Sequence, residues 1–314
     1  RLMLQERSSG VVVVLLGASL WGTIGTTYAL IQERVAVDDV TLVTLRAAVI
    51  AVAWFAVHDR GAFTIRSSDR GPMVVFGLVS VTAFYLALVY AFRYSSVAVG
   101  TLLLYLAPAL VTLGAALWFN EPLTRVKVGA LLLSFTGLLL IVQVYRPSGL
   151  GIDWLGIAFG LAAAVTYGSY SLIGKPLMAH YRPATLLVWN LSIGAAGLLV
   201  IKLVVSPMSW PSLVESSGIA LYTGLMLSVL PVGLYTVGLS RLPSSEASIL
   251  ATVEPVVAMV LATWLLDERL GPGQLIGAAC IVGGVVLLTV SGRRLLGRWH
   301  AAWSRGAARR TARG

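Results

Sequence analysis

The chain has 314 residues, of which 58% are hydrophobic and 11% charged, and its mean hydropathy is +0.88. A soluble domain carries about 25% charged residues, so this composition excludes a water-soluble globular protein. The net charge of +10 would favour a nucleic-acid partner in a soluble chain, but most of the excess lies in the tail from Arg293 onward. No nucleic-acid partner is therefore predicted, and the tail is expected to contact anionic membrane lipids.

Ten apolar runs follow one another along the chain, each close to the ~20 residues that a helix needs to cross a bilayer. Short connections rich in turn residues separate them, and none is long enough to form a soluble domain. The sequence therefore predicts an all-α, multi-pass membrane protein with ten transmembrane helices. The expected spans are 11–31, 40–57, 72–92, 96–118, 126–145, 154–174, 184–205, 218–239, 246–266 and 273–291.

Lysine and arginine residues predict which way these spans point. If the N-terminus lies inside, the inner segments hold seventeen of these residues and the outer segments hold five. Cytoplasmic loops carry such an excess of positive charge. Both termini are therefore expected in the cytoplasm.

The two halves of the chain share a pattern. A shift of 147 residues aligns "LLLYLAPALVTLGAALWFNEPL" (102–123) with "ILATVEPVVAMVLATWLLDERL" (249–270), so that Pro108 meets Pro255 and a glutamate follows thirteen residues later in both halves. Matches of leucine and alanine carry little weight in apolar sequence, whereas the proline and glutamate matches carry more. The pattern therefore indicates an internal repeat.

Each half holds five spans, an odd number, so the two halves are expected to sit in the membrane with opposite topology. The prediction is two inverted five-helix repeats, 1–147 and 148–292, followed by a basic cytoplasmic tail, 293–314. Inverted repeats are typical of alternating-access carriers, which bind substrate near the membrane midplane at the repeat interface. This organisation predicts a transporter.

In each half, a helix with a proline is followed by an acidic motif, "NEPL" at 120–123 and "DERL" at 267–270, and then by a helix that contains glycine. The chain here resembles the EamA-type carriers of the drug/metabolite transporter superfamily, most of all the bacterial ten-helix amino-acid exporters. The resemblance covers about 11–290. It implies that spans 1–4 and 6–9 surround a central cavity and that spans 5 and 10 lie at the periphery. It also implies export of small metabolites across the bacterial inner membrane.

Three prolines within spans are candidate hinges: Pro108, Pro231 and Pro255. Proline removes a backbone donor and weakens a helix, so the carbonyls of Leu104 and Ala251 would lose their usual partners. A static kink is the alternative for each proline. The match between Pro108 and Pro255 favours a hinge or a position beside the cavity.

Aromatic side chains in the middle of spans are candidates for the lining of the substrate cavity. A phenol or indole group there needs a hydrogen-bond partner, which a polar cavity would supply. Packing between helices is the alternative role. The predicted aromatic lining is Trp21, Tyr85, Tyr105, Tyr167 and Tyr235.

Three polar side chains within spans are further candidates for the cavity. Arg46 is costly in a span unless it snorkels outward or finds a partner, such as a substrate carboxylate. Asn190, opposite Arg46 in the other half, is expected to link helices or to line the cavity. Glu254, directly before Pro255, either anchors a broken helix or takes part in transport. Arg46 would favour an anionic cargo group and Glu254 a cationic one, so the pair would suit a zwitterion.

The sequence disfavours other classes of function. No histidine cluster could hold a metal within the membrane, no Walker loop is present, and no span has the paired carboxylates of a hydrolytic enzyme. No enzyme activity, metal or cofactor is therefore predicted. The predicted function is export of a small-molecule substrate, foremost a neutral or aromatic amino acid, by alternating access. A multidrug or sugar-type metabolite carrier of the same fold is the alternative, and a channel or a membrane enzyme is less favoured.

Overall fold

The computed structural model describes residues 2–32, 64–143, 153–205, 218–219, 221–267 and 269–311. These residues form helices joined by short turns, and none of the described residues lies in a β-strand. Apolar segments adopt this structure in a bilayer because a helix satisfies its own backbone hydrogen bonds. The helical elements are α1 (Leu2–Gly22), α2 (Ile24–Gln32), η2 (Ser67–Asp69), α4 (Arg70–Gly77), η3 (Leu78–Ala83), α5 (Phe84–Tyr94), α6 (Val97–Leu104), α7 (Ala107–Phe119), α8 (Arg125–Val142), α9 (Trp154–Leu177), α10 (Pro183–Val205), η4 (Leu225–Val229), α12 (Leu230–Arg241), α13 (Ser244–Leu250), η5 (Ala251–Val253), α14 (Glu254–Leu265) and α15 (Pro272–Thr311).

Nine helical segments in the described part of the chain are long and apolar enough to cross a membrane. Each lies where a span is predicted, with ends that differ by a few residues. The predicted span at 40–57, together with Arg46, lies outside the described residues. The nine segments are Gln5–Thr27, Ser67–Tyr94, Val97–Phe119, Arg125–Val142, Trp154–Leu177, Pro183–Val204, Leu221–Arg241, Ser244–Leu265 and Pro272–Ser291.

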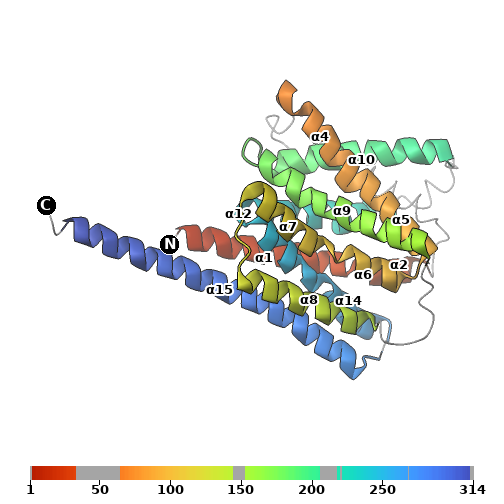
Figure 1. The fold of residues 1–314 in the computed structure, drawn as a ribbon. Helices are drawn as coiled ribbons and strands as arrows, with labels where there is room; N and C mark the ends of the chain where they lie inside the picture. The colour runs from red at the N-terminus through yellow and green to blue at the C-terminus, as the bar shows by residue number, and fades with distance from the viewer. Residues whose placement is uncertain are drawn as a thin grey trace.

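The helices lie side by side in a bundle (Figure 1). α8 and α15, which correspond to the predicted spans 5 and 10, pack against each other along one flank of the bundle (Figure 1). The N-terminus and the C-terminus lie toward the same end, here called the terminal end (Figure 1). α15 continues without interruption from its spanning part to Thr311, so the predicted tail begins as a helix.

Polar residues begin several of the spans. Ser96, Thr124 and Asp153 each accept a hydrogen bond from a backbone N–H in the first turn of α6, α8 and α9, at 3.2, 3.2 and 3.1 Å. Such side chains replace the partners that the first N–H groups of a helix lack. The short connections of the sequence therefore fix where these three helices start.

Irregular helix geometry recurs in the two halves of the chain. The π-helix η3 begins at Leu78 and the π-helix η4 begins 147 residues later, at Leu225. Asn120 and Asp267, again 147 residues apart, both have φ of 54°. Left-handed residues of this kind commonly end helices. The two halves thus share local backbone features at the spacing that the sequence repeat predicts.

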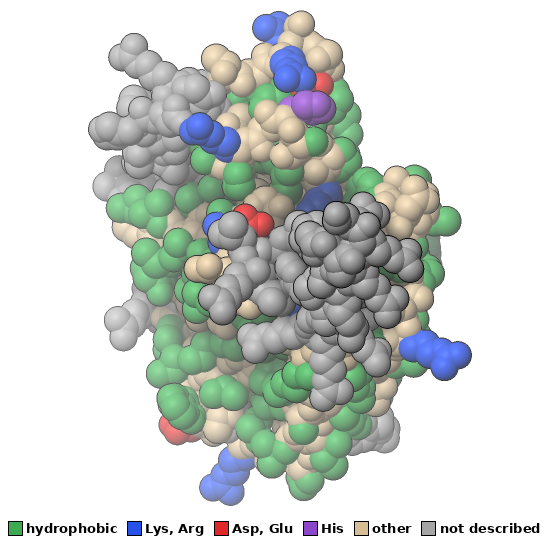
Figure 2. Space-filling model, turned by 90° about the vertical axis from the view of Figure 1, so that its left-hand side faces the viewer, with side chains coloured by type: hydrophobic (Ala, Val, Ile, Leu, Met, Phe, Trp, Pro, Cys, Tyr) green, Lys and Arg blue, Asp and Glu red, His purple; other side chains and the backbone are tan. Residues whose placement is uncertain are grey.

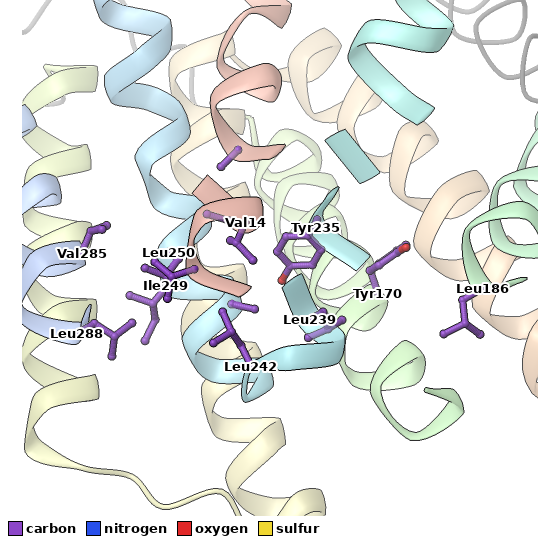
Figure 3. Close-up of a cluster of buried hydrophobic side chains, with 14 of the residues drawn as sticks. Val14, Tyr170, Leu186, Tyr235, Leu239, Leu242, Ile249, Leu250, Val285 and Leu288 are labelled. Atoms are coloured by element: carbon purple, nitrogen blue, oxygen red, sulfur yellow. The ribbon is translucent and has the colours of Figure 1, made fainter. Parts of the chain in front are cut away.

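A core of buried apolar side chains fills the bundle toward the terminal end (Figure 3). It includes Val14 of α1, Leu239 of α12, Ile249 and Leu250 of α13, and Leu288 of α15, each at most 3% exposed. Side chains from helices far apart in the sequence therefore close this part of the bundle to water.

α8 and α15 approach closely where Gly137 faces Gly277. A Cβ atom added to Gly137 would lie 2.4 Å from the Gly277 carbonyl oxygen, and one added to Gly277 would lie 2.5 Å from the Gly137 carbonyl oxygen. A backbone oxygen cannot rotate away as a flexible side chain can, so this contact requires glycine at both positions. Small residues allow such close packing between membrane helices.

Replacement of Gly277 by leucine is expected to separate α8 from α15 and to lower the unfolding temperature in detergent by several degrees. Overpacking of this kind costs about 1–3 kcal/mol. The matched control is Gly283→Leu on the same helix, because nothing lies within 4 Å of a Cβ atom built at Gly283. The control should unfold at the temperature of the unsubstituted protein, and equal unfolding temperatures for the two variants would contradict the proposed role of this contact.

Candidate binding site among the helices

Aromatic side chains from four helices meet in the interior of the bundle. The ring of Trp21, from α1, lies 6.1 Å from that of Tyr167 in α9 and 5.5 Å from that of Tyr235 in α12, measured between centroids. The ring of Phe84, in α5, lies 5.3 Å from that of Tyr167 and 5.1 Å from that of Tyr85. Four of the five predicted aromatic residues therefore belong to one cluster.

Tyr105 and Glu254 lie beside this cluster, at two breaks in the helices. Tyr105 occupies the turn that follows α6, and Glu254 begins α14 directly after η5. The Tyr105 side chain lies close enough to the Glu254 carboxylate to interact with it. Tyr167 is close enough to interact electrostatically with both residues. The two helix breaks thus bring a hydroxyl and a carboxylate to the rings.

A glycine places α1 against the start of α14. A Cβ atom on Gly22 would lie 2.7 Å from the Glu254 carbonyl oxygen and 2.8 Å from Cβ of Val257. α1 can therefore approach α14 this closely only because residue 22 has no side chain. This approach brings Trp21, the preceding residue, to the part of the bundle that holds Glu254.

Several of these side chains have partners on other helices and still expose part of their surface. Trp21, Tyr85, Tyr105, Tyr167 and Glu254 are all half-buried. Trp21 and Tyr167 lie between helices, because their rings contact rings of α12 and α5. These five residues and Tyr235 are called the ring–carboxylate site.

A second layer of hydrogen bonds holds the tyrosines behind the ring–carboxylate site. The Tyr235 hydroxyl shares a hydrogen bond of 2.8 Å with the hydroxyl of Ser171, and the Tyr170 hydroxyl shares one of 2.5 Å with that of Thr236. Tyr235 is 5% exposed and Tyr170 9%, and both extend from their helices into the packed interior (Figure 3). These bonds join α9 to α12. The bond to Ser171 holds Tyr235, which forms one side of the ring–carboxylate site, in place.

Asn190 lies in a different environment from the rings. Its side chain has no exposed surface, and its amide nitrogen donates to the Phe76 carbonyl oxygen at 3.1 Å and to the Ser80 hydroxyl at 2.8 Å. It therefore links α10 to the junction of α4 and η3. Phe76 in turn contacts Tyr170, with 4.9 Å between ring centroids, so Asn190 lies behind the second layer.

The three candidate hinge prolines all lie in the first turn of a helix that follows an irregular segment. Pro108 is in the first turn of α7, Pro231 in that of α12 after η4, and Pro255 in that of α14 after η5. Proline fits a first turn because an N–H group there has no helical partner. The breaks begin directly after Leu104 and at Ala251, the residues whose carbonyls were expected to lose their partners. The role of the prolines as hinges stays a prediction.

A glutamate outside the predicted site organises the terminal end of the bundle. Glu121, in the turn after α7, accepts hydrogen bonds from the backbone N–H groups of Ser244 and Ser245 at 2.7 and 3.3 Å. It also accepts one from the Ser245 hydroxyl and pairs with Lys127 at 3.3 Å. A carboxylate at a helix start satisfies free N–H groups and complements the helix dipole. Glu121 therefore joins the turn after α7 to the start of α13.

Two cations contact residues on either side of the turn between α12 and α13. The Lys175 ammonium donates to the carbonyl oxygens of Leu239 and Leu242, both at 2.7 Å, at the end of α12. Arg7 of α1 forms an ion pair of 2.7 Å with Glu246 of α13. Together with Glu121, these contacts tie the turn to α1, α7 and α9. Figure 2 looks onto this end, where Lys and Arg side chains stand out on a largely apolar surface.

A pocket of about 520 Å³ lies at the terminal end, between the start of α4 and the turn from α9 to α10. Arg66, His180 and Tyr181 are among its lining residues. The Tyr181 hydroxyl accepts from the Arg66 backbone N–H at 3.0 Å and donates to Asp69 at 2.6 Å. No residue of the ring–carboxylate site lines this pocket, so the two features are separate.

Apolar helices of spanning length around an internal cluster of aromatic and polar side chains define an integral, multi-pass membrane protein. The sequence model of the EamA-like transporter family matches residues 8–143 and 154–290. The chain therefore belongs to the EamA-like transporter family. This assignment indicates a transporter and not an enzyme.

Curated relatives carry transporter names. The chain is 25% identical to an uncharacterized inner membrane transporter, YicL, of Salmonella typhimurium over 91% of this chain and 96% of that protein. It is 27% identical to an uncharacterized transporter of Archaeoglobus fulgidus, over 88% and 95% of the two chains. It is 26% identical to a probable terminal-alkyne amino-acid exporter of Streptantibioticus cattleyicolor, over 85% and 87%.

A crystal structure of a protein that is 22% identical superposes on this chain with a TM-score of 0.75. The superposition covers 92% of this chain and 99% of the other. At this identity, the likeness shows a shared fold. It extends over almost the whole of the other protein.

Proposed function

We propose that the protein is a secondary transporter that exports small metabolites, foremost neutral or aromatic amino acids, across the bacterial inner membrane. The observation that carries this proposal is the ring–carboxylate site, where aromatic side chains and one carboxylate gather at two helix breaks inside the bundle. Ligand sites of this kind are mostly apolar with a few placed polar groups. Membership of the EamA-like transporter family supports the proposal, as does the similarity to a probable amino-acid exporter.

The aromatic walls suit a cargo with an apolar or aromatic side chain. Trp21, Tyr85 and Tyr167 offer ring faces and edges within one cluster, and aromatic pairs of this geometry contribute about 0.5–1.5 kcal/mol beyond the area they bury. A carboxylate among rings is also an arrangement that holds a cationic drug. A multidrug carrier is therefore the second candidate function.

Alternating access is the mechanism we propose. The terminal end, where the termini are expected in the cytoplasm, is closed by the apolar core and by the contacts of Glu121, Lys175 and Arg7 around one turn. Discontinuous helices with irregular backbone at a binding site are typical of inverted-repeat carriers. Release of the contacts at the terminal end, with movement at the Pro108 and Pro255 breaks, would expose the site to the cytoplasm.

The test is reconstitution of the purified protein into liposomes with a panel of radiolabelled amino acids, cationic drugs and sugars, with and without a pH gradient. The proposal predicts saturable uptake of at least one neutral or aromatic amino acid. Uptake of cationic drugs alone would favour the multidrug function, and uptake that never saturates would favour a channel. Failure to move any compound of the panel would overturn the proposed transport function.

A further inference from the structure

We infer that the ring–carboxylate site recognises the ammonium group of its cargo, and that Glu254 is the residue that determines this specificity. The inference rests on the proposed function and names the chemical class of the cargo: amines with an apolar or aromatic body, whether or not they carry a carboxylate. It is argued from the partners of Glu254, from the rings around it and from the charges at the terminal end.

Glu254 has a neutral partner in the described part of the chain. Tyr105 is the residue that interacts with its side chain, and the two oxygens of a carboxylate offer about four acceptor sites. A charged group within a membrane protein needs a partner of opposite charge or a wet cavity. The half-buried state of Glu254 gives such a partner a place to reach it.

The cations described near this part of the chain have other partners. Lys175 donates to two carbonyl oxygens at the end of α12, Lys127 pairs with Glu121, and Arg7 pairs with Glu246. All three lie at the terminal end of the bundle. None of these three cations therefore pairs with Glu254, and an ammonium group of the cargo would supply an opposite charge.

The rings around Glu254 also favour binding of an ammonium group. Tyr105 and Tyr167 lie within electrostatic reach of the carboxylate, and the ring of Trp21 contacts that of Tyr167. The ring of Tyr85 contacts that of Phe84, which in turn contacts Tyr167. Aromatic faces attract cations, and tryptophan and tyrosine are the rings that do so best. An ammonium group placed between Glu254 and these rings would gain a charge-assisted hydrogen bond together with cation–π contacts.

A carboxylate at this position also discriminates against anions. A cargo with a carboxylate and no amine would place like charges together in a site of low polarity, and like charges opposed in this way are costly. The site should therefore accept an aromatic amine and reject the acid of the same size. Phenylalanine, 2-phenylethylamine and 3-phenylpropionate form a matched set, because they share the aromatic body and differ in these two groups.

The test is equilibrium binding of tritiated 2-phenylethylamine to the purified full-length protein in detergent, with unlabelled phenylalanine and 3-phenylpropionate as competitors. We expect 2-phenylethylamine and phenylalanine to compete and 3-phenylpropionate to be at least tenfold weaker. Glu254→Gln should weaken binding of the amine at least tenfold, and Glu6→Gln, which removes an exposed carboxylate, should leave it unchanged.

Equal competition by 3-phenylpropionate, or unchanged binding in Glu254→Gln, would overturn the inference, as would absence of binding by the unsubstituted protein. If Glu254→Gln does not fold, judged by size-exclusion chromatography, the comparison of the three compounds on the unsubstituted protein decides whether the site selects the ammonium group. Because the readout is binding, amine-selective binding without any transport would contradict the proposed function and leave this inference standing.

Discussion

Replacement of Glu121 by alanine is expected to lower the free energy of unfolding by about 3 kcal/mol, the loss that follows when one partner of a buried ion pair is removed. The variant would leave the N–H groups of Ser244 and Ser245 and the ammonium of Lys127 without their acceptor. Unsatisfied donors of this kind bear the full cost of their desolvation. The measurement is thermal unfolding in detergent, where the unfolding temperature should fall by several degrees.

Two further variants separate the contributions of Glu121. Glu121→Gln keeps an oxygen that can accept from the start of α13 and loses the charge beside Lys127, so its unfolding temperature should lie between those of the alanine variant and the unsubstituted protein. Glu6→Ala removes an exposed carboxylate at the same end of the chain and should change little. If Glu121→Ala unfolds at the temperature of Glu6→Ala, the turn between α12 and α13 does not depend on Glu121.

Replacement of Trp21 by alanine is expected to raise the half-saturating concentration of an aromatic amino acid about tenfold, which corresponds to a loss of about 1.4 kcal/mol in binding free energy. Trp21 joins the rings of Tyr167 and Tyr235, so its removal opens the wall of the ring–carboxylate site on the side of α1. The measurement is initial uptake rate against concentration in proteoliposomes.

Trp264→Ala is the matched control for the Trp21 variant. Trp264 is 78% exposed and lies near the end of α14, so its loss should leave the half-saturating concentration unchanged. A similar increase in both variants would mean that tryptophan removal disturbs the protein in general. An unchanged half-saturating concentration in Trp21→Ala would show that Trp21 does not contact the cargo.

The spans could be predicted from the sequence because length and apolar composition alone determine which segments cross a bilayer. The positions of the helix breaks followed from Pro108 and Pro255, since proline withdraws a donor at a known distance along the helix. Trp21, Tyr167 and Tyr235 were predicted to line the cavity because they lie in the middle of spans. The structure places their rings in one cluster, and their role as lining stays a prediction.

Contacts between distant segments could not be predicted from the sequence. Lipid-facing and buried surfaces of a membrane helix are both apolar, so no polar stripe shows which way Phe84, Ser171 or Thr236 points. No residue pattern in the sequence predicts the π-helices η3 and η4. Glu121 pairs with Lys127 and caps a helix that begins at Ser244, and nothing in the sequence indicates that the turn after α7 meets the start of α13.

The measurement that tests the central claim most directly is counterflow of labelled phenylalanine in liposomes preloaded with the unlabelled amino acid. A carrier with one cargo site at Glu254 and the surrounding rings predicts a transient accumulation of label above equilibrium in liposomes that contain the unsubstituted protein. It predicts a strongly reduced accumulation at the same concentration with Glu254→Gln. Equilibration of the label without such accumulation, or accumulation of equal size with Glu254→Gln, would contradict the account.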